Sequence, residues 1–336
     1  MSAPMAMNAI RAADAASIAL GARLLREGKL VAFPTETVYG LGADARNADA
    51  VRRIFAAKGR PESHPVIVHV EGLAGAEAWA AQIPDGARAL ARAFWPGPLT
   101  LIVPRAPDVP DAVTGGQDSV GLRAPAHPVA RAFLAAFGGG IAAPSANRFG
   151  HVSPTTARHV ADDLGDNVEL ILDGGACDVG IESTIVAFTT GTPMLLRPGG
   201  IGLDAIAAVL GSMPLARDAA APRASGTLTS HYAPHTPASL VASDGLYAEL
   251  GQLAERDERV AVLAWSADAP EPFDGVWIRA PRDAASYART LYANLRGLDM
   301  AKADSILIER VPQGGDWIAI GDRLSRATSG DADDRD

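Results

Sequence analysis

Residues 48–70 read ADAVRRIFAAKGRPESHPVIVHV, and they place one helix and one strand in succession. The spacing of apolar residues over Ala48–Lys58 predicts an amphipathic helix, which Gly59 ends. Two prolines then fix an extended loop, and Pro65–Val70 predicts a strand. Helices that alternate with strands are typical of α/β proteins, so this segment predicts that fold class.

The same alternation extends on both sides of this segment, and no internal repeat is found. Further helices are predicted at 15–27, 73–82, 86–94, 128–137, 155–164 and 201–210. Further strands are predicted at 30–33, 99–103, 119–123, 141–143, 170–172, 183–188 and 194–197. We therefore expect one domain over residues 9–213, preceded by a frayed tail of eight residues.

A change of composition follows this domain. Residues 214–237 contain four prolines and no sustained periodicity, which is typical of a linker. After it we predict strands at 238–241, 259–263, 276–279 and 305–309 and helices at 246–256, 284–300 and 317–326. Residues 238–328 are thus expected to form a small, open, parallel α/β sheet, and 329–336 a disordered acidic tail.

Length and composition agree with two soluble domains. The chain has 336 residues, and about 150 residues per domain is an ordinary size. Cys177 is the only cysteine, which excludes an intrachain disulfide and a multi-cysteine zinc site and favours a reducing cytoplasm. The longest uncharged stretches are too short or too interrupted to span a bilayer, so no membrane association is expected.

The formal charge of −9 is unevenly distributed along the chain. Residues 238–336 hold 18 acidic and 11 basic side chains, whereas residues 1–237 hold 21 and 19. An acidic chain is a poor candidate for gripping a nucleic-acid backbone, and no stable nucleic-acid binding is expected. The first domain is nearly neutral and can still contain a basic pocket for a small anion.

The loop at Pro34–Gly42 gathers Thr35, Glu36, Thr37 and Tyr39 after a buried strand, which favours a polar binding site. Its glycines, with Ala45, also match a degenerate dinucleotide-binding pattern, but a single match of this kind is weak. A Gly-containing tight turn is the structural alternative.

Lys58 and Arg60 are two cations in a loop that prolines make rigid, and this favours their binding of the same phosphate group. The lysine ammonium would act as a point charge, and the arginine guanidinium would donate two hydrogen bonds. A solvated charged loop is the structural alternative. His64 and His69 follow, and hydrogen bonding to a substrate or a structural role is favoured over metal binding, because no third ligand is evident.

Three later loops add polar groups at strand ends. Arg123 closes an apolar strand, Ser145-x-Asn147 lies among small residues, and Arg197 follows another strand. No Walker-type phosphate loop occurs, and no nucleophile elbow surrounds Ser145. His231 and His235 have zinc-like spacing, but Pro234 breaks a helix there and no cysteine accompanies them, so zinc is not expected.

Together these loops resemble the YrdC-like family of L-threonylcarbamoyladenylate synthases. The similarity rests on Lys58-x-Arg60, Ser145-x-Asn147, the segments 34–41 and 119–125, and the linker segment Ser230–Pro237, which resembles the long, two-domain form. The resemblance implies a twisted mixed-sheet α/β domain with a concave basic site. It also implies a smaller Rossmann-like α/β domain, joined through a Pro-rich linker that acts as an active-site lid.

The resemblance further implies a reaction. L-Threonine and bicarbonate form a carbamate that attacks the α-phosphorus of ATP, giving threonylcarbamoyl-AMP and pyrophosphate. A downstream tRNA threonylcarbamoyl transferase then modifies the adenosine next to the anticodon. Mg²⁺ is expected to accompany ATP without an assigned protein ligand, and zinc, NAD and haem are not expected.

Site residues are carried over from the family by position. Lys58 and Arg60 are the expected catalytic groups. ATP contacts are expected from Lys58, Arg60, His64, Ser119, Ser145, Asn147, Ser153, Arg197 and Tyr232. Threonine contacts are expected from Thr37, His69, Arg123, the Ala143 backbone and Ser183.

Three alternatives were weighed. An RNA-binding module of the same fold lacks support from the acidic balance and from any basic stripe interleaved with aromatic residues. A carbamoyl-transfer role like that within hydrogenase maturation proteins would need additional zinc-binding regions. A nicotinamide dehydrogenase would bind its cofactor through Gly40 and Gly42.

Overall fold

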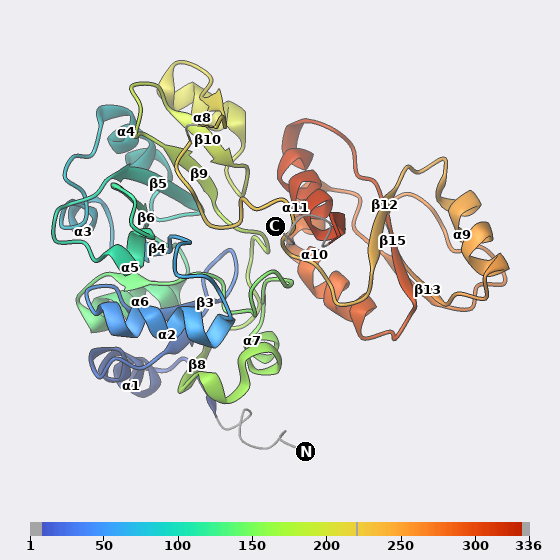
Figure 1. Cartoon of the computed structure of the whole chain (residues 1–336), viewed down its shortest axis with the longest axis horizontal. Helices are drawn as coiled ribbons and strands as arrows, with labels where there is room; N and C mark the ends of the chain where they lie inside the picture. The colour runs from blue at the N-terminus through green and yellow to red at the C-terminus, as the bar shows by residue number, and fades with distance from the viewer. Residues whose placement is uncertain (1–8, 220, 331–336) are drawn as a thin grey trace. The chain divides into compact units, whose positions relative to one another are not determined.

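A computed structural model of the chain describes residues 9–219 and 221–330, and it divides into two compact units (Figure 1). Unit 1 comprises residues 9–149 and 153–227. Unit 2 comprises residues 150–152 and 228–330. The chain therefore leaves unit 1 once at 150–152, returns, and leaves it again within the segment predicted as a linker. The expected tails at 1–8 and 331–336 lie outside the described residues.

Unit 1 is built on one mixed sheet of eleven strands within the described residues. The strands are β1 (Ile10–Ala12), β2 (Val31–Phe33), β3 (Gly40–Asp44), β4 (Ile67–His69), β5 (Leu99–Pro104), β6 (Ser119–Arg123), β7 (Ile141–Ala142), β8 (Leu170–Asp173), β9 (Thr184–Ala187), β10 (Met194–Arg197) and β11 (Leu215–Ala216). Their order is β1-β8-β2-β3-β7-β4-β6-β5-β9-β10-β11. Parallel and antiparallel neighbours both occur, as between β4 and β6 and between β5 and β6, so the expected twisted mixed sheet is confirmed.

The helices of unit 1 pack on this sheet (Figure 1). They are α1 (Ala15–Arg26), α2 (Ala48–Lys58), α3 (Leu73–Glu77), α4 (Asp85–Phe94), α5 (Asp111–Thr114), α6 (Pro128–Phe137), α7 (Ala157–Leu164) and α8 (Leu203–Leu210). Most long elements match the predicted ones, because their apolar periodicity is strong. The helix predicted at 73–82 is an exception, because α3 ends at Glu77. The short elements β1, α5 and β11 were not predicted, since two to four residues carry no periodic pattern.

The tight turn considered as the structural alternative at Gly40–Gly42 does not form, because these residues belong to strand β3, which pairs with β2 and β7. A Cβ on Gly42 would lie 3.0 Å from side-chain atoms of Ile141 and Phe33 and from the Val31 carbonyl oxygen. The glycine therefore permits close packing of neighbouring strands. A strand at this position also removes the strand–turn–helix geometry that a dinucleotide-binding loop requires.

Helix α2 ends at Lys58, directly before the loop that contains Arg60. Asn47 caps the helix by accepting hydrogen bonds from the N–H groups of Asp49 and Ala50, both at 3.1 Å. Gly59 ends it with φ +65°, a left-handed conformation that favours glycine. Lys58 is consequently the last helical residue, as predicted, and its side chain is buried.

Unit 2 is a parallel sheet flanked by helices, as predicted (Figure 1). Its elements are β12 (Ala238–Val241), α9 (Leu246–Glu255), β13 (Val260–Ala264), β14 (Val276–Arg279), α10 (Ala284–Asp299), β15 (Ser305–Glu309) and α11 (Ile318–Thr328). The strand order is β12-β15-β13-β14. Helix α9 packs over Val260, Val262 and Leu307 on one face, whereas α10 and α11 cover the other. No helix within residues 9–219 and 221–330 has the length and hydrophobicity to cross a bilayer.

Candidate functional site

Lys58 joins the two loops that the sequence singled out. Its Nζ donates to the carbonyl oxygens of Ser145 at 2.6 Å and Asn147 at 2.5 Å, and it lies 3.5 Å from the Asn147 Oδ1. Burial, with a smaller contribution from the nearby Arg60 charge, holds the pKa of Lys58 well below its ordinary value. The structure therefore brings together Lys58-x-Arg60 and Ser145-x-Asn147, which are separated by more than eighty residues.

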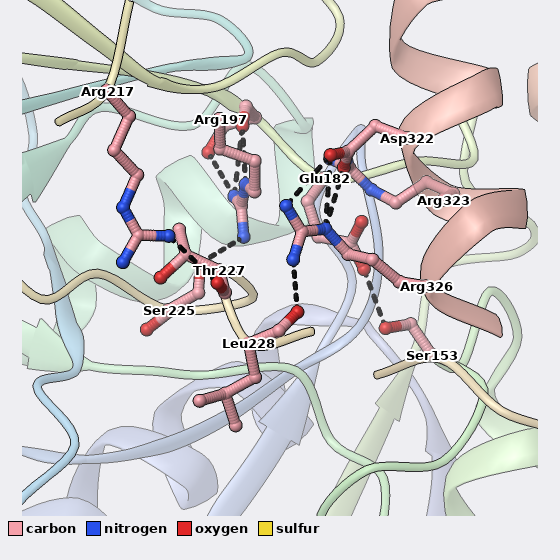
Figure 2. Close-up of polar contacts among 11 residues, drawn as sticks. Ser153, Glu182, Arg197, Arg217, Ser225, Thr227, Leu228, Asp322, Arg323 and Arg326 are labelled. Carbon is pink, nitrogen blue, oxygen red and sulfur yellow. Dashed lines mark hydrogen bonds and ion pairs between the residues drawn. The ribbon is translucent and has the colours of Figure 1, made fainter. Parts of the chain in front are cut away.

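Arg60 follows Lys58 by two residues, and it is also buried. Its Nη2 donates to the Pro65 carbonyl at 2.8 Å and to the Ser225 Oγ at 3.3 Å. Arg197 reaches the same serine, because its Nη1 donates to the Ser225 carbonyl at 2.8 Å (Figure 2). Ser225 thus connects two guanidinium groups that were both expected to contact ATP.

Arg197 also fixes Ser183, a predicted threonine contact. Its Nε and Nη2 donate to the Ser183 carbonyl at 3.1 and 2.9 Å. The Ser183 Oγ lies 2.7 Å from the Thr100 Oγ1, and all three residues are buried. Neighbouring Glu182 accepts a hydrogen bond from the Ser153 Oγ at 2.6 Å (Figure 2). The strand end at 182–184 therefore lies next to a third predicted ATP residue, Ser153.

A buried ion pair lies at the end of strand β6. Arg123 Nη2 is 2.6 Å from Glu36 Oε1, and the two side chains are only 5% and 8% exposed. Glu36 Oε2 accepts a hydrogen bond from the Ala126 N–H at 3.0 Å. Burial raises the pKa of Glu36, but the Arg123 charge and these hydrogen bonds outweigh it and lower that pKa overall. The pair is consequently ionised at neutral pH.

His69 lies beside Arg123, because the two residues are register partners on the parallel strands β4 and β6. Burial and then the Arg123 charge lower the pKa of His69 to about 3, so the imidazole is neutral at physiological pH. The nearby backbone groups of Ile67 and Ile141 partly oppose this lowering of the pKa. Within the described residues Nδ1 has no partner. We adopt the neutral tautomer with the ring proton on Nε2, in which Nδ1 carries an acceptor lone pair.

Two buried polar atoms lie at the ends of the neighbouring strands β4 and β6. The Arg123 Nε–H is a buried donor with no acceptor among the residues that the structure describes. The neighbouring His69 Nδ1 is a buried acceptor with no donor there. Leaving such groups unsatisfied costs about 1–3 kcal/mol each. A ligand that reached both atoms would need an acceptor for the Arg123 Nε–H and a donor for the His69 Nδ1.

The remaining predicted residues of unit 1 lie on separate strands and loops. Thr37 is fully buried, and its Oγ1 lies 2.8 Å from the Thr35 Oγ1. The Ala143 N–H donates to the Ile67 carbonyl at 2.9 Å, and buried Ser119 begins β6. The His64 ring meets the Phe149 ring edge-on, with centroids 5.5 Å apart.

Tyr232 belongs to unit 2, unlike the other predicted residues. Its backbone has φ +66°, which is uncommon for a tyrosine. Its ring stacks on Tyr292 at 5.7 Å between centroids, and the Arg323 guanidinium lies over it at 5.3 Å. The ring is therefore part of the interior of unit 2.

Sequence reasoning assigned no role to Glu36, Thr100, Glu182 or Ser225, although Glu36 was noted in its loop. Each contacts a predicted site residue, at 2.6, 2.7, 2.6 and 2.8 Å respectively. Two of these residues carry a signal that could have identified them. Thr100 lies inside the apolar strand β5, and Glu182 lies two residues before the apolar strand β9. The contacts of Ser225 have no such signal.

Comparison with known proteins identifies the family of this chain. Residues 23–199 match the Sua5/YciO/YrdC sequence family, described as "Telomere recombination". Residues 201–329 match a family described as "Threonylcarbamoyl-AMP synthase, C-terminal domain". The chain belongs to the Sua5/YciO/YrdC family. The resemblance seen in the sequence is thereby confirmed, and so is the second domain of the long form.

Relatives of similar length share both domains. A threonylcarbamoyl-AMP synthase from Pyrococcus abyssi is 41% identical over 326 residues, covering 93% of this chain and 94% of that protein. Another from Bacillus subtilis is 40% identical over 323 residues and covers 93% of each chain. The crystal structure of P. abyssi Sua5 complexed with L-threonine superposes with a TM-score of 0.86 at 40% identity, covering 93% of this chain and 94% of that one.

Proposed function

We propose that this chain synthesises threonylcarbamoyl-AMP and pyrophosphate from L-threonine, bicarbonate and ATP. Full-length similarity to threonylcarbamoyl-AMP synthases supports the activity. The observation that carries the proposal is the pairing of a buried donor on Arg123 with a buried acceptor on His69. An α-amino acid presents a carboxylate and hydrogen-bond donors close together, which are the two kinds of partner that these atoms can take.

Threonine binds, in this proposal, with its carboxylate at the Arg123 Nε–H and a donor at the His69 Nδ1. Ser183, Thr37 and the Ala143 backbone complete its surroundings. Ser183 supports this role because Thr100 and Arg197 hold its hydroxyl and carbonyl oxygens. His69 acts as a hydrogen-bond acceptor rather than as a general base, because a pKa of about 3 makes it a poor proton acceptor.

The reaction forms two bonds in sequence. The neutral amine of threonine attacks the carbon of bicarbonate, a C–N bond forms, and water leaves. An oxygen of the resulting carbamate then attacks the α-phosphorus of ATP, and the bond to the β-phosphate bridging oxygen breaks to release pyrophosphate. Such displacements depend on positioning and charge neutralisation more than on a protein nucleophile.

ATP binds, in this proposal, at the basic part of a concave site where Lys58, Arg60 and Arg197 converge. Ser145, Asn147, Ser153, His64 and Ser119 contribute further contacts. Lys58 supports this assignment because its buried Nζ already donates to the backbone of two of these residues. Arg60 and Arg197 can exchange their contacts with neutral Ser225 for phosphate oxygens, which are stronger acceptors for a guanidinium.

Mg²⁺ enters with the nucleotide. Residues 9–219 and 221–330 contain no cluster of three histidine, cysteine, aspartate or glutamate side chains suited to a metal. In this proposal Mg²⁺ is held mainly by phosphate oxygens and water, as is usual for Mg²⁺ with ATP. When bound, the ion neutralises charge on the departing pyrophosphate.

The proposal also gives the linker the role of an active-site lid and assigns a downstream enzyme that consumes the product. Linker residues Ala221 and Ala224 pack against an apolar cluster of unit 1, which supports a lid anchored on that unit. The ATP contact expected of Tyr232 stays a prediction. Exclusion of water by the lid would protect the carbamate and the adenylate. A tRNA threonylcarbamoyl transferase consumes the product.

Pyrophosphate release tests the proposed function. The full-length protein is assayed with ATP and Mg²⁺, with threonine and bicarbonate each omitted in turn. Release should require both substrates. Release that is unaffected by threonine would refute the synthase proposal.

A further inference from the structure

Glu36 is a buried carboxylate for which the proposed chemistry has no direct use. It lies in the loop between β2 and β3 and is 6% exposed. Its two carboxylate oxygens accept from Arg123 and from the Ala126 N–H, and its carbonyl accepts from the Val179 N–H at 2.7 Å. Glu36 therefore ties together three segments: the loop after β2, the end of β6, and the loop that follows β8.

The contacts of Glu36 engage one end of the Arg123 guanidinium. Nη2 is held at 2.6 Å, whereas the buried Nε–H has no acceptor within the described residues. A charge-assisted hydrogen bond of this length fixes a side chain that otherwise has many rotamers. Since Arg123 and His69 are register partners, fixing the guanidinium also fixes its donor relative to the His69 acceptor.

We propose that Glu36 is a positioning residue that holds Arg123 in the orientation that receives the substrate carboxylate. This rests on the proposed function, in which Arg123 binds the carboxylate of threonine. Glu36 touches neither substrate in this scheme. It acts by engaging the Nη2 end of Arg123, so that Nε–H remains directed toward the ligand.

Glu36→Gln tests this role because one amide oxygen cannot serve both contacts that the carboxylate serves. The amide keeps one acceptor, and its NH₂ group opposes either the Arg123 Nη2 or the Ala126 N–H. Threonine affinity should fall by about 10- to 100-fold, the range for hydrogen bonds to charged groups. The affinity for a non-hydrolysable ATP analogue should change by less than about twofold, within the usual effect of a remote substitution.

A substrate pair separates positioning from a general structural role. Threoninamide lacks the carboxylate charge, and the wild-type protein should prefer threonine to it in kcat/KM. In Glu36→Gln this preference should decline toward unity, because Arg123 no longer presents its donor correctly. A role limited to stability would leave the ratio unchanged.

Glu169→Gln is a matched control. Glu169 also accepts from a backbone N–H, that of Leu30 at 3.0 Å, and also pairs with a cation, Lys29, at 3.7 Å. It has none of the site contacts described above, so both affinities and the substrate ratio should remain at wild-type values. Glu36→Asp, which keeps the charge but is shorter, provides the same measurements if Glu36→Gln does not fold.

The outcomes distinguish this inference from the proposed function. If the wild-type protein does not bind threonine, the proposed function itself is refuted. If the wild-type protein prefers threonine to threoninamide and the Glu36 variant keeps that preference, only the positioning role is refuted. Tighter threonine binding in Glu36→Gln would also refute it, because that result means that the carboxylate merely opposes the substrate charge.

Discussion

His69 makes the stability of unit 1 depend on pH in a predictable way. Its pKa is about 3 in the folded protein, against an ordinary value of 6.5. The unfolded chain therefore binds a proton below about pH 6.5 that the folded chain does not bind, and stability falls as pH decreases toward about 3. Above the ordinary value both states are neutral, and the residue contributes no pH dependence.

The magnitude follows from the two pKa values. Between about pH 7.5 and about pH 5, His69 alone should lower the free energy of unfolding by about 2 kcal/mol, since each pKa unit corresponds to about 1.4 kcal/mol. Glu36 and Arg123, whose charges act on His69, do not change charge in this interval. The pKa of Glu36 lies below its ordinary value of 4.5, and an arginine stays protonated.

The experiment compares the wild-type protein with His69→Gln. Unfolding in urea is followed at both pH values by pulsed hydrogen exchange, read on peptides that contain β4, so that only unit 1 is measured. The substitution changes stability at both pH values, but the wild-type protein should lose about 2 kcal/mol more than the variant on acidification. The other histidines are present in both proteins and cancel. Equal losses would mean that His69 is protonated normally in the folded state, and the acceptor role of Nδ1 would be refuted.

Two further predictions address the phosphate-binding residues and the strand geometry. Lys58→Ala and Arg60→Ala should each reduce the rate of pyrophosphate formation by about 100-fold or more, as expected for loss of a group that stabilises a charged transition state. Arg52→Ala, on the exposed part of α2, is the control and should retain activity. Wild-type rates in both site variants would remove these residues from the mechanism. Gly42→Ala should destabilise unit 1 by about 1–3 kcal/mol in urea unfolding, because its Cβ would lie 3.0 Å from three neighbours, one of them a backbone oxygen. Gly121→Ala in β6 is the control, since its Cβ would meet neighbours at ordinary distances of 3.5 Å and more, and equal effects of the two substitutions would contradict the packing argument.

The sequence predicted the fold wherever periodicity extended over a full element. Helix α2, for example, was predicted from its first to its last residue, including the glycine that ends it. Strand β3 was missed because Gly40 and Gly42 are typical of turns, whereas here they permit strands to approach closely. That reason is tertiary and cannot be seen in a local pattern.

The site was predicted in its residue types but not in its internal contacts. Lys58, Asn147 and Arg123 were identified from loops at strand ends and from the family resemblance. The Glu36–Arg123 pair joins residues 87 positions apart, and only the register of the sheet brings them together. The contact of Ser225 with two arginines likewise depends on a linker that has no periodicity.

Isotope incorporation tests the central claim most directly. The full-length protein is incubated with ATP, Mg²⁺, L-threonine and ¹³C-labelled bicarbonate, and the products are examined by mass spectrometry. We expect threonylcarbamoyl-AMP that contains the label in its carbamoyl carbon, formed together with pyrophosphate. If ATP is consumed and no adenylate carries both threonine and the labelled carbon, the proposed reaction is wrong.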